Sequence, residues 1–171
     1  TSNGTTWFDK SNGLVISQIY KIGVAQTVAD DVVAGLQDNG TKSYSGGSWD
    51  DVKGGDGMDC AIDYTNENVQ YGSYVYGQIS RTDNHWGSYI DIEPSAAGDG
   101  AWLTPYVLDP VVSTTIYAGY SNVWKSTNKG SSWTQISTMN SSNKLRAITV
   151  APSNTAVIYT SDNSNIWRTT D

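Results

Sequence analysis

Short runs of alternating apolar and polar residues, separated by small polar turns, fill most of this 171-residue chain. The flanks NVWKS and TQIS, on either side of residues 127–133, alternate as half-buried strands do. Four runs, VVAGL, VQYGS, TIYAGY and VIYTS, recur along the chain and begin at Val32, Val69, Thr115 and Val157. The one candidate helix, near Val28–Gly35, contains adjacent β-branched valines and runs into a turn. The pattern therefore predicts an all-β chain of many short strands.

Turns that a tryptophan closes repeat with the same period. The series GTTW, GGSW, DNHW and GSSW ends at Trp7, Trp49, Trp86 and Trp133, with spacings of 42, 37 and 47 residues. A third series of polar turns (AQTVADD, DYTNEN, DPVVST, APSNTA) keeps the same phase. Each period predicts four short antiparallel strands in about 40–45 residues, which is the unit of a β-propeller blade. In the third period we expect strands near Leu103–Leu108, Thr115–Tyr120, Val123–Ser126 and Trp133–Ser137.

The repeats predict one β-propeller segment over residues 1–171, with about four blades. The expected blades are 10–52, 57–92, 101–138 and 144–171, with 1–9 as the last strand of a preceding blade. The chain opens on TSNGTTW, half of a tryptophan hairpin, and closes on IWRTTD, which matches VWKSTN. We interpret it as a fragment of a larger propeller whose remainder lies in the same or a partner chain. The alternative, a closed four-bladed ring, is at the small limit of the architecture.

Composition narrows the classes of function. The formal net charge is −7 with ten basic residues, which disfavours a surface for nucleic acid or for anionic membranes. No apolar run is long enough for membrane insertion. Cys60 is the one cysteine, so no disulfide framework is expected, and in MDCAID it is predicted to be a small buried residue. Few lysines with abundant Asn, Thr and Trp suggest a secreted or cell-surface protein.

The string STNKGSSW at 126–133 resembles the Asp-box, or BNR repeat, Ser-x-Asp-x-Gly-x-x-Trp. Ser126, Asn128, Gly130 and Trp133 occupy its positions, and Asp171 would be the Asp of the next box. Families with this repeat include sialidases, xyloglucan-cleaving glucanases, sortilin-type receptors and photosystem assembly factors. The stretches GLQDNGT and GGDGMDCAID also resemble large secreted BNR-repeat proteins of Bacteroidetes. The resemblance implies a bacterial β-propeller in which these hairpins are structural and function lies elsewhere.

If the box hairpins join the third and fourth strands of each blade, the other loops share the opposite face. That face is expected to collect Asp38, Asn39, Asp56, Asp59, Tyr74, Tyr76, Glu93, Asp99, Trp102, Tyr120 and Asp162. Tyr and Trp rings stack on sugars, and Asp and Asn side chains take hydroxyl hydrogen bonds. The favoured function is therefore the binding of a glycan or a protein partner, without catalysis by this segment.

Three other interpretations remain open. Asp38 with Asp56 or Asp59 could be the carboxylate pair of a glycoside hydrolase, and AGLQDNG weakly resembles acid-carrying loops of xyloglucan-cleaving propellers. The same three aspartates in Gly-rich loops could bind calcium, the one cofactor considered. The propeller could also be purely structural, or a protein-interaction module.

Two kinds of site are not supported by the sequence. A sialidase arginine triad is not expected, because Arg81, Arg146 and Arg168 lie in or beside strands at non-equivalent places and no RIP motif occurs. His85 is the only histidine, so neither a zinc site nor a Ser-His-Asp triad is predicted.

Overall fold

The computed structural model describes residues 4–8, 17–139 and 142–169 and contains four antiparallel sheets in chain order. The first has β1 (Ile19–Val24), β2 (Val32–Leu36), β3 (Gly40–Ser45) and β4 (Ser48–Lys53), and the second has β5 (Cys60–Asp63), β6 (Asn66–Tyr74), β7 (Gln78–Thr82) and β8 (Ile90–Asp91). The third has β9 (Tyr106–Leu108), β10 (Ile116–Gly119), β11 (Val123–Ser126) and β12 (Thr134–Gln135). The fourth has β13 (Ala147–Val150), β14 (Ile158–Ser161) and β15 (Ile166–Thr169). A 3-10 turn, η1 (Val75–Gly77), follows β6.

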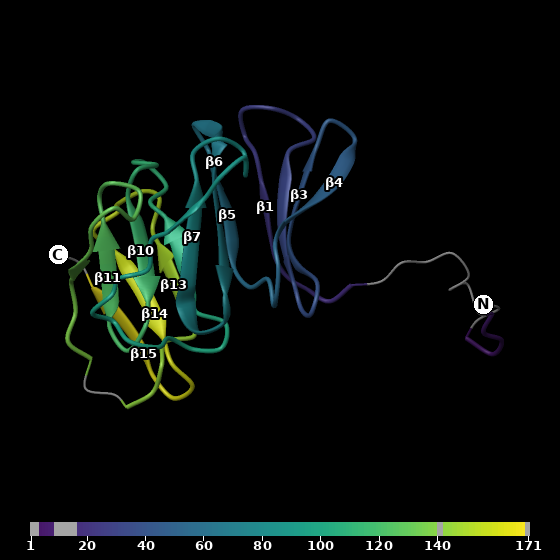
Figure 1. The fold of residues 1–171 in the computed structure, drawn as a ribbon. Coiled ribbons are helices and arrows are strands. Elements are labelled where there is room, and N and C mark those ends of the chain that lie inside the picture. The colour runs from purple at the N-terminus through teal and green to yellow at the C-terminus, as the bar shows by residue number, and fades with distance from the viewer. Residues whose placement is uncertain (1–3, 9–16, 140–141, 170–171) are drawn as a thin grey trace.

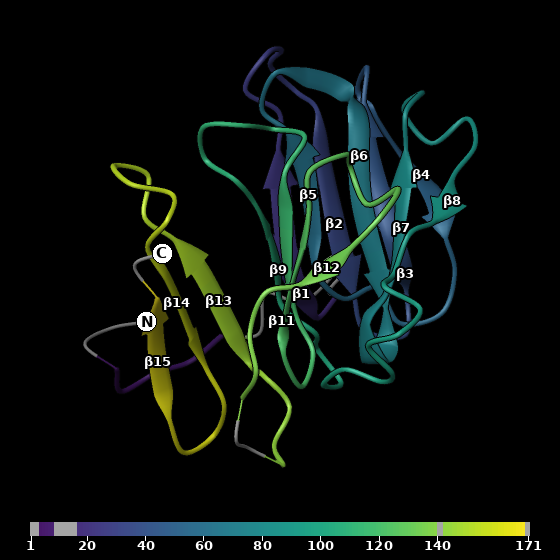
Figure 2. The same cartoon turned by 90° about the vertical axis from the view of Figure 1, so that its left-hand side faces the viewer.

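Within each sheet the strands are neighbours in sequence order, which is the topology of a propeller blade. The first strands pack side by side, β1 with β5, β5 with β9 and β9 with β13, so they form the inner edge of the arc. Figures 1 and 2 show the sheets following one another, with the first sheet (β1–β4) and the fourth sheet (β13–β15) at the two ends of the series. The predicted all-β propeller fold is confirmed, and these sheets are called blades 1 to 4.

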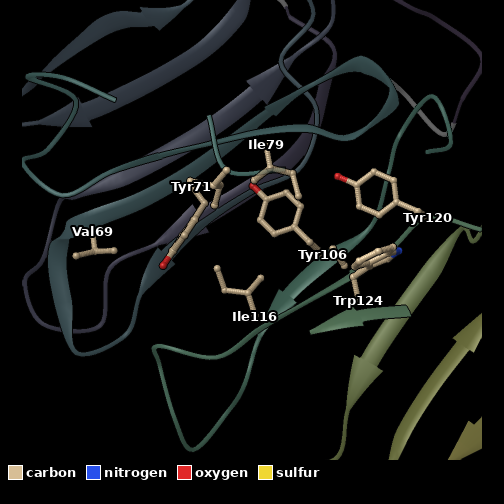
Figure 3. Close-up of a cluster of buried hydrophobic side chains, with 9 residues drawn as sticks. Val69, Tyr71, Ile79, Tyr106, Ile116, Tyr120 and Trp124 are labelled. Carbon is tan, nitrogen blue, oxygen red and sulfur yellow. The ribbon is translucent and has the colours of Figure 1, made fainter. Parts of the chain in front are cut away.

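The hydrophobic core lies between the blades. The largest cluster joins Val69, Tyr71 and Ile79 of blade 2 to residues of blade 3 that include Tyr106 and Ile116 (Figure 3). Two smaller clusters lie between blades 1 and 2 and between blades 3 and 4. Neighbouring blades thus bury the faces that they turn toward each other, as alternating strands allow.

The turns and loops that connect the strands lie at two opposite ends of the blades. The end that carries the turns between third and fourth strands is called the turn face. The opposite end, the loop face, carries the second-to-third turns 37–39, 75–77, 120–122 and 162–165 and the blade-to-blade loops 54–59 and 92–105, with the described loop residues 136–139 and 142–146. At the amino terminus, residues 4–8 form no strand and Trp7 is exposed, in contrast to the strand predicted at 1–9, whose other residues lie outside the described chain.

The turn after β11 is fixed by its own side chains. Ser126 Oγ accepts the N–H groups of Asn128 and Gly130, and Asn128 Oδ1 accepts the Ser132 N–H. Lys129 and Gly130 both have positive φ, 57° and 84°. The turn also holds the preceding blade, because Trp133 Nε1 donates to the Ile92 carbonyl. A Cβ on Gly130 would lie 2.4 Å from the Ile92 side chain, so glycine is required there twice over.

The turn after β7 has the same hydrogen bonds as the turn after β11. Its residues correspond to those of the later turn with a shift of three positions from the alignment that pairs Trp86 with Trp133. Thr82 Oγ1 accepts the N–H groups of Asn84 and Trp86, and Asn84 Oδ1 accepts the Ser88 N–H. Trp86 therefore occupies the place of Gly130, with φ 64°, and Tyr89 the place of Trp133. The sequence alignment of Trp86 with Trp133 is wrong, because the hydroxyl and amide residues set the register of this turn and the aromatic ring does not.

Candidate functional site

The two acidic loops of blade 1 meet on the loop face. Asp38 lies in the β2–β3 turn with φ 58°, and its N–H donates to Asp56 Oδ1 at 2.8 Å. Asp38 and Asn39 are exposed, Asp56 is half-buried, and Asn39 Nδ2 donates to the Gln37 carbonyl. A surface hollow beside this turn is lined by Ser17, Gln18, Gln37, Asp38 and Asn39. The structure thus brings Asp38 next to Asp56.

Asp59 lines a different hollow from Asp38. Asp59 immediately precedes β5 and is 6% exposed, and its Oδ1 accepts the Cys60 N–H at 2.8 Å. Burial raises the pKa of the Asp59 carboxyl to about 6, and the attraction of Lys21, whose Nζ lies 3.6 Å from Oδ1, opposes part of that rise. A carboxyl group with this pKa exchanges its proton near neutral pH.

Asp59 faces a cavity of about 220 Å³ at the inner edge of the arc. The cavity is built from the beginnings of the first strands and the segments before them, and its walls are Tyr20, Lys21, Asp59, Leu103, Pro105, Tyr106, Val107, Arg146, Ala147 and Ile148. All four blades therefore contribute to it. Its charged groups are one carboxyl and two cations, so a polar ligand could be held between apolar walls.

An exposed aromatic pair stands on the same face. Tyr76 of η1 and Trp102 of the loop before β9 meet edge to face, with ring centroids 5.5 Å apart. Tyr76 is 43% exposed and Trp102 is 40% exposed. The backbone fixes the pair, since the Tyr76 N–H donates to the Trp102 carbonyl and the Gly100 N–H donates to the Tyr76 carbonyl. Tyr76 has φ 60°, a region in which a bulky residue is strained.

Other predicted ligand-binding residues serve the fold. Tyr120 is 2% exposed and its hydroxyl donates to the Gly77 carbonyl at 2.6 Å, so its ring is not presented to a ligand as the sequence analysis expected. Asp162 is 7% exposed, and its Oδ1 accepts the N–H groups of Ser164 and Asn165 in a tight turn. Tyr74 packs its ring against Gly55.

The two remaining acidic candidates lie in the long loop between β8 and β9. Glu93 is half-buried with a buried Oε2. Burial raises the pKa of the Tyr120 hydroxyl, and the charge of Glu93 adds to that rise. Asp99 is exposed three residues before Trp102. Asp99 is thus available to solvent, whereas Glu93 is partly covered.

The remaining candidates are the possible calcium ligands, Cys60 and His85. Within the described ranges, no group of three His, Cys, Asp or Glu residues is placed to hold a metal ion, so calcium at Asp38, Asp56 and Asp59 stays a prediction. Cys60 is 2% exposed, and burial raises the pKa of its thiol to about 12. His85 Nε2 lies 2.8 Å from Asp31 Oδ1 on the turn face, where it links blade 2 to blade 1.

Sequence reasoning missed the residues that surround Asp59. Lys21, Arg146 and Tyr106 were not candidates, yet all three line the central cavity with it. A signal was present, because each stands at or beside the beginning of the first strand of its blade, in blades 1, 3 and 4. In a propeller those positions converge at the axis.

No family model matches the sequence, and no curated protein matches it. Solved structures do resemble it. An ancestral GH74 enzyme aligns with a TM-score of 0.71 and 19% identity over 90% of this chain and 23% of its own. The GH74 enzyme of Niastella koreensis gives 0.68 and 19% over 91% of this chain and 28% of its own.

Two further structures extend the likeness. The GH74 xyloglucanase from Xanthomonas campestris has a TM-score of 0.68 and 10% identity, over 91% of this chain and 29% of its own. The computationally designed Ika4 protein has 0.63 and 9%, over 91% of this chain and 92% of its own. This chain therefore spans between about a quarter and a third of the length of the GH74 structures. In its described part, no helix has the length and apolarity to cross a membrane. The likeness establishes the β-propeller fold, of which the described residues form four blades.

Proposed function

We propose that this propeller segment binds glycan on its loop face, with Tyr76 and Trp102 as the sugar-contacting platform. The observation that carries the proposal is the pair itself. Two large rings, each about two-fifths exposed, are held edge to face by hydrogen bonds of their own backbone. Tyr76 keeps a strained φ of 60°. Because its ring is not buried, packing in the core does not explain the strain.

The chemistry around the pair suits a neutral polysaccharide. Aromatic rings offer apolar faces for the CH surfaces of sugars, and nearby polar groups can fix the hydroxyls. Asp99 is exposed in the same loop as Trp102, and the β2–β3 turn presents Asp38 and Asn39 on the same face. One structural neighbour is a xyloglucanase, so a β-glucan backbone with xylose branches is the first ligand to test.

The broader setting of this proposal comes from the repeat. The turns at Ser126 and Thr82, with their shared hydrogen bonds, support an Asp-box type of blade in a BNR-repeat propeller. The resemblance of GLQDNGT and GGDGMDCAID to secreted BNR-repeat proteins of Bacteroidetes supports a secreted or cell-surface bacterial setting.

Binding to soluble xyloglucan, barley β-glucan and laminarin can be measured by affinity electrophoresis and calorimetry. We expect xyloglucan to bind wild type, and Tyr76→Ala and Trp102→Ala each to weaken binding at least tenfold. Tyr89→Ala is the matched control, since Tyr89 is a 46% exposed aromatic on the turn face. Equal affinity in all three variants, or no binding of any polysaccharide by wild type, would remove the loop-face platform.

A second candidate function is glycoside hydrolysis, which the environment of Asp59 favours. A carboxyl with a pKa of about 6 stays protonated at mildly acidic pH and can serve as the general acid. Asp56, held by the Asp38 N–H, lies three residues away and is the nearest candidate in sequence for the second carboxylate.

Hydrolysis can be followed as reducing ends released from the same polysaccharides. The candidate predicts turnover that Asp59→Asn and Asp56→Asn abolish while xyloglucan binding survives. Absence of turnover by wild type on all of them, at pH 5 and pH 7, would reject hydrolysis by this segment and leave the binding function.

A further inference from the structure

A hollow of about 270 Å³, which we call the rim hollow, lies beside the fourth strands of blades 2 and 3, at the outer edge of the blades. Its walls are residues 91–96, which end β8 and begin the loop after it, Trp124 of β11, and residues 130–133 of the turn before β12. Blades 2 and 3 each have a neighbouring blade on both sides. The rim hollow contains neither Tyr76 nor Trp102, so a ligand there is independent of the proposed glycan platform.

Hydrogen bonds hold the two walls of the rim hollow against each other. Trp133 Nε1 donates to the Ile92 carbonyl across the blades, and the Ile92 N–H donates to the Ile79 carbonyl at 2.8 Å. The Ala97 N–H donates to the Pro94 carbonyl at 2.9 Å and closes a turn in the loop wall. A ligand would therefore meet a hollow that is already formed.

Glu93 brings an unsatisfied carboxylate to the rim hollow. Its Oε2 is buried, and no described residue donates a hydrogen bond to it. None of the ion pairs among the described residues includes Glu93. Asp91 adds a second carboxylate, and the described residues that line the hollow include no lysine or arginine. A buried carboxylate oxygen without a donor destabilises the fold, so the stability of the fold does not explain Glu93.

The groove between blades 1 and 2 shows which group fills the equivalent position. Tyr89 occupies there the place that Trp133 has between blades 2 and 3. Lys53 Nζ lies 5.1 Å from the centroid of the Tyr89 ring and 3.5 Å from Asp91 Oδ1. The first groove thus places an ammonium group between an aromatic ring and a carboxylate, and the chain itself supplies it.

The strand register identifies the residue that stands in place of this lysine. Lys53 pairs with Thr41, the second residue of β3, and the Ile92 N–H donates to Ile79, the second residue of β7. Ile92 therefore takes the place of Lys53, and Glu93 follows it. The second groove keeps the aromatic ring and the carboxylate, but an apolar side chain stands where the first groove has its ammonium.

We propose that the rim hollow binds a primary ammonium group, carried by a ligand the size of an amino sugar or a short alkyl chain. The Glu93 carboxylate is its counter-ion, and Trp124 and Trp133 form its aromatic wall. An ammonium group supplies the donors that a carboxylate requires, and tryptophan is the aromatic side chain that attracts cations most strongly. The net charge of −7 also favours a cationic ligand over an anionic one.

Butylammonium, which carries the ammonium group without a sugar, is the first probe. Its binding is measured by calorimetry and by the Tm of the protein at constant ionic strength. We expect butylammonium to bind wild type and raise its Tm, and Glu93→Gln to weaken binding at least tenfold, because the counter-ion is lost. Asp99→Asn is the matched control, since it removes one negative charge from an exposed position of the same loop.

Glucosamine and glucose test whether a sugar can carry the ammonium group. Both are measured in Tyr76→Ala, which removes the proposed glycan platform, so the two sites are tested separately. Glucosamine should bind this variant and glucose should not. Glucose that binds as tightly as glucosamine would overturn the ammonium group as the determinant of binding.

The ligand-free stability of Glu93→Gln separates a binding role from a structural one. Because Oε2 has no donor, the variant should have a Tm at or above that of wild type. A Tm well below wild type would give Glu93 a structural role and overturn the site. Absence of butylammonium binding to wild type at about 50 mM, or equal binding by Glu93→Gln, would also overturn it, whatever the result with xyloglucan.

Lys53→Ala tests the comparison of the two grooves. The variant removes the ammonium group beside Tyr89 and Asp91, so butylammonium should bind there as well as in the rim hollow. We expect two butylammonium ions per chain and a larger rise in Tm than in wild type. A single ion per chain with an unchanged rise in Tm would overturn the equivalence from which the ammonium ligand is inferred.

Discussion

The turn face and the loop face differ in how their structure is determined. On the turn face, blades 2 and 3 repeat one turn whose hydroxyl and amide side chains bind its own backbone N–H groups. On the loop face, each blade differs, from the three-residue turn at 37–39 to the loop at 92–105. The turn face fastens one blade to the next, and the loop face is free to vary. The most recognisable string in the sequence is therefore structural, and candidate function lies at the other end of the strands.

The largest expected effect tests the turn face through Trp86→Gly. Trp86 has φ 64°, so glycine would relieve backbone strain, but its ring packs on the cluster between blades 1 and 2 and donates to Gln70 Oε1 at 2.7 Å. Loss of a packed tryptophan removes about 3–5 kcal/mol, well above the strain that is relieved. We expect urea unfolding to show a loss of about 3 kcal/mol. A change below about 1 kcal/mol would mean that Trp86 does not hold the blades together.

A second prediction concerns the loop face and pH. The pKa of the Asp59 carboxyl is raised from 3.8 to about 6 by burial, so the folded protein holds this proton across a range in which the unfolded chain has lost it. The free energy of unfolding therefore loses a contribution from Asp59 as pH rises from about 4 to about 6, and the full loss is present above pH 6. The difference corresponds to about 3 kcal/mol.

Asp59→Asn removes this titration, so the difference in stability between variant and wild type should shift by that amount in favour of the variant between pH 4 and pH 7. Urea titrations at several pH values measure it, and Asp99→Asn, an exposed carboxyl on the same face, is the control. A difference that stays constant with pH would show that the Asp59 pKa is ordinary.

A third prediction returns to the repeated turn. Ser126 Oγ is buried, accepts the N–H groups of Asn128 and Gly130, and donates to Asn128 Oδ1 at 2.9 Å. Ser126→Ala leaves these backbone groups without their partner, so we expect a loss of about 2 kcal/mol in the free energy of unfolding. Ser132→Ala, at an exposed position of the same turn, should lose less than half of that. Equal effects would indicate that the turn is held by its backbone alone.

The repeat was readable from the sequence because strands and turns are local. The runs at Val32 and Thr115 alternate with a period of two, and the turn at Ser126 carries its own hydrogen-bonding groups. The central cavity is harder to predict: its residues stand at equivalent places in their repeats, but Lys21 and Arg146 are more than a hundred residues apart and line one cavity only because four blades curve around it. Likewise, Tyr120 and Tyr76 look alike in sequence, and only packing shows that one ring is buried and the other exposed.

The smallest expected change in stability provides the sharpest comparison with Trp86. Tyr76 shares with Trp86 an aromatic side chain at positive φ, here 60°, but its ring is 43% exposed and contacts chiefly Trp102. Tyr76→Gly relieves about 1 kcal/mol of strain and loses an exposed ring contact of about the same size. We expect the free energy of unfolding to stay within about 1 kcal/mol of wild type, while xyloglucan affinity falls at least tenfold. If Tyr76→Gly destabilises the fold as much as Trp86→Gly, Tyr76 is a packing residue. If it changes neither the free energy of unfolding nor the xyloglucan affinity, the strain at Tyr76 has no role in binding.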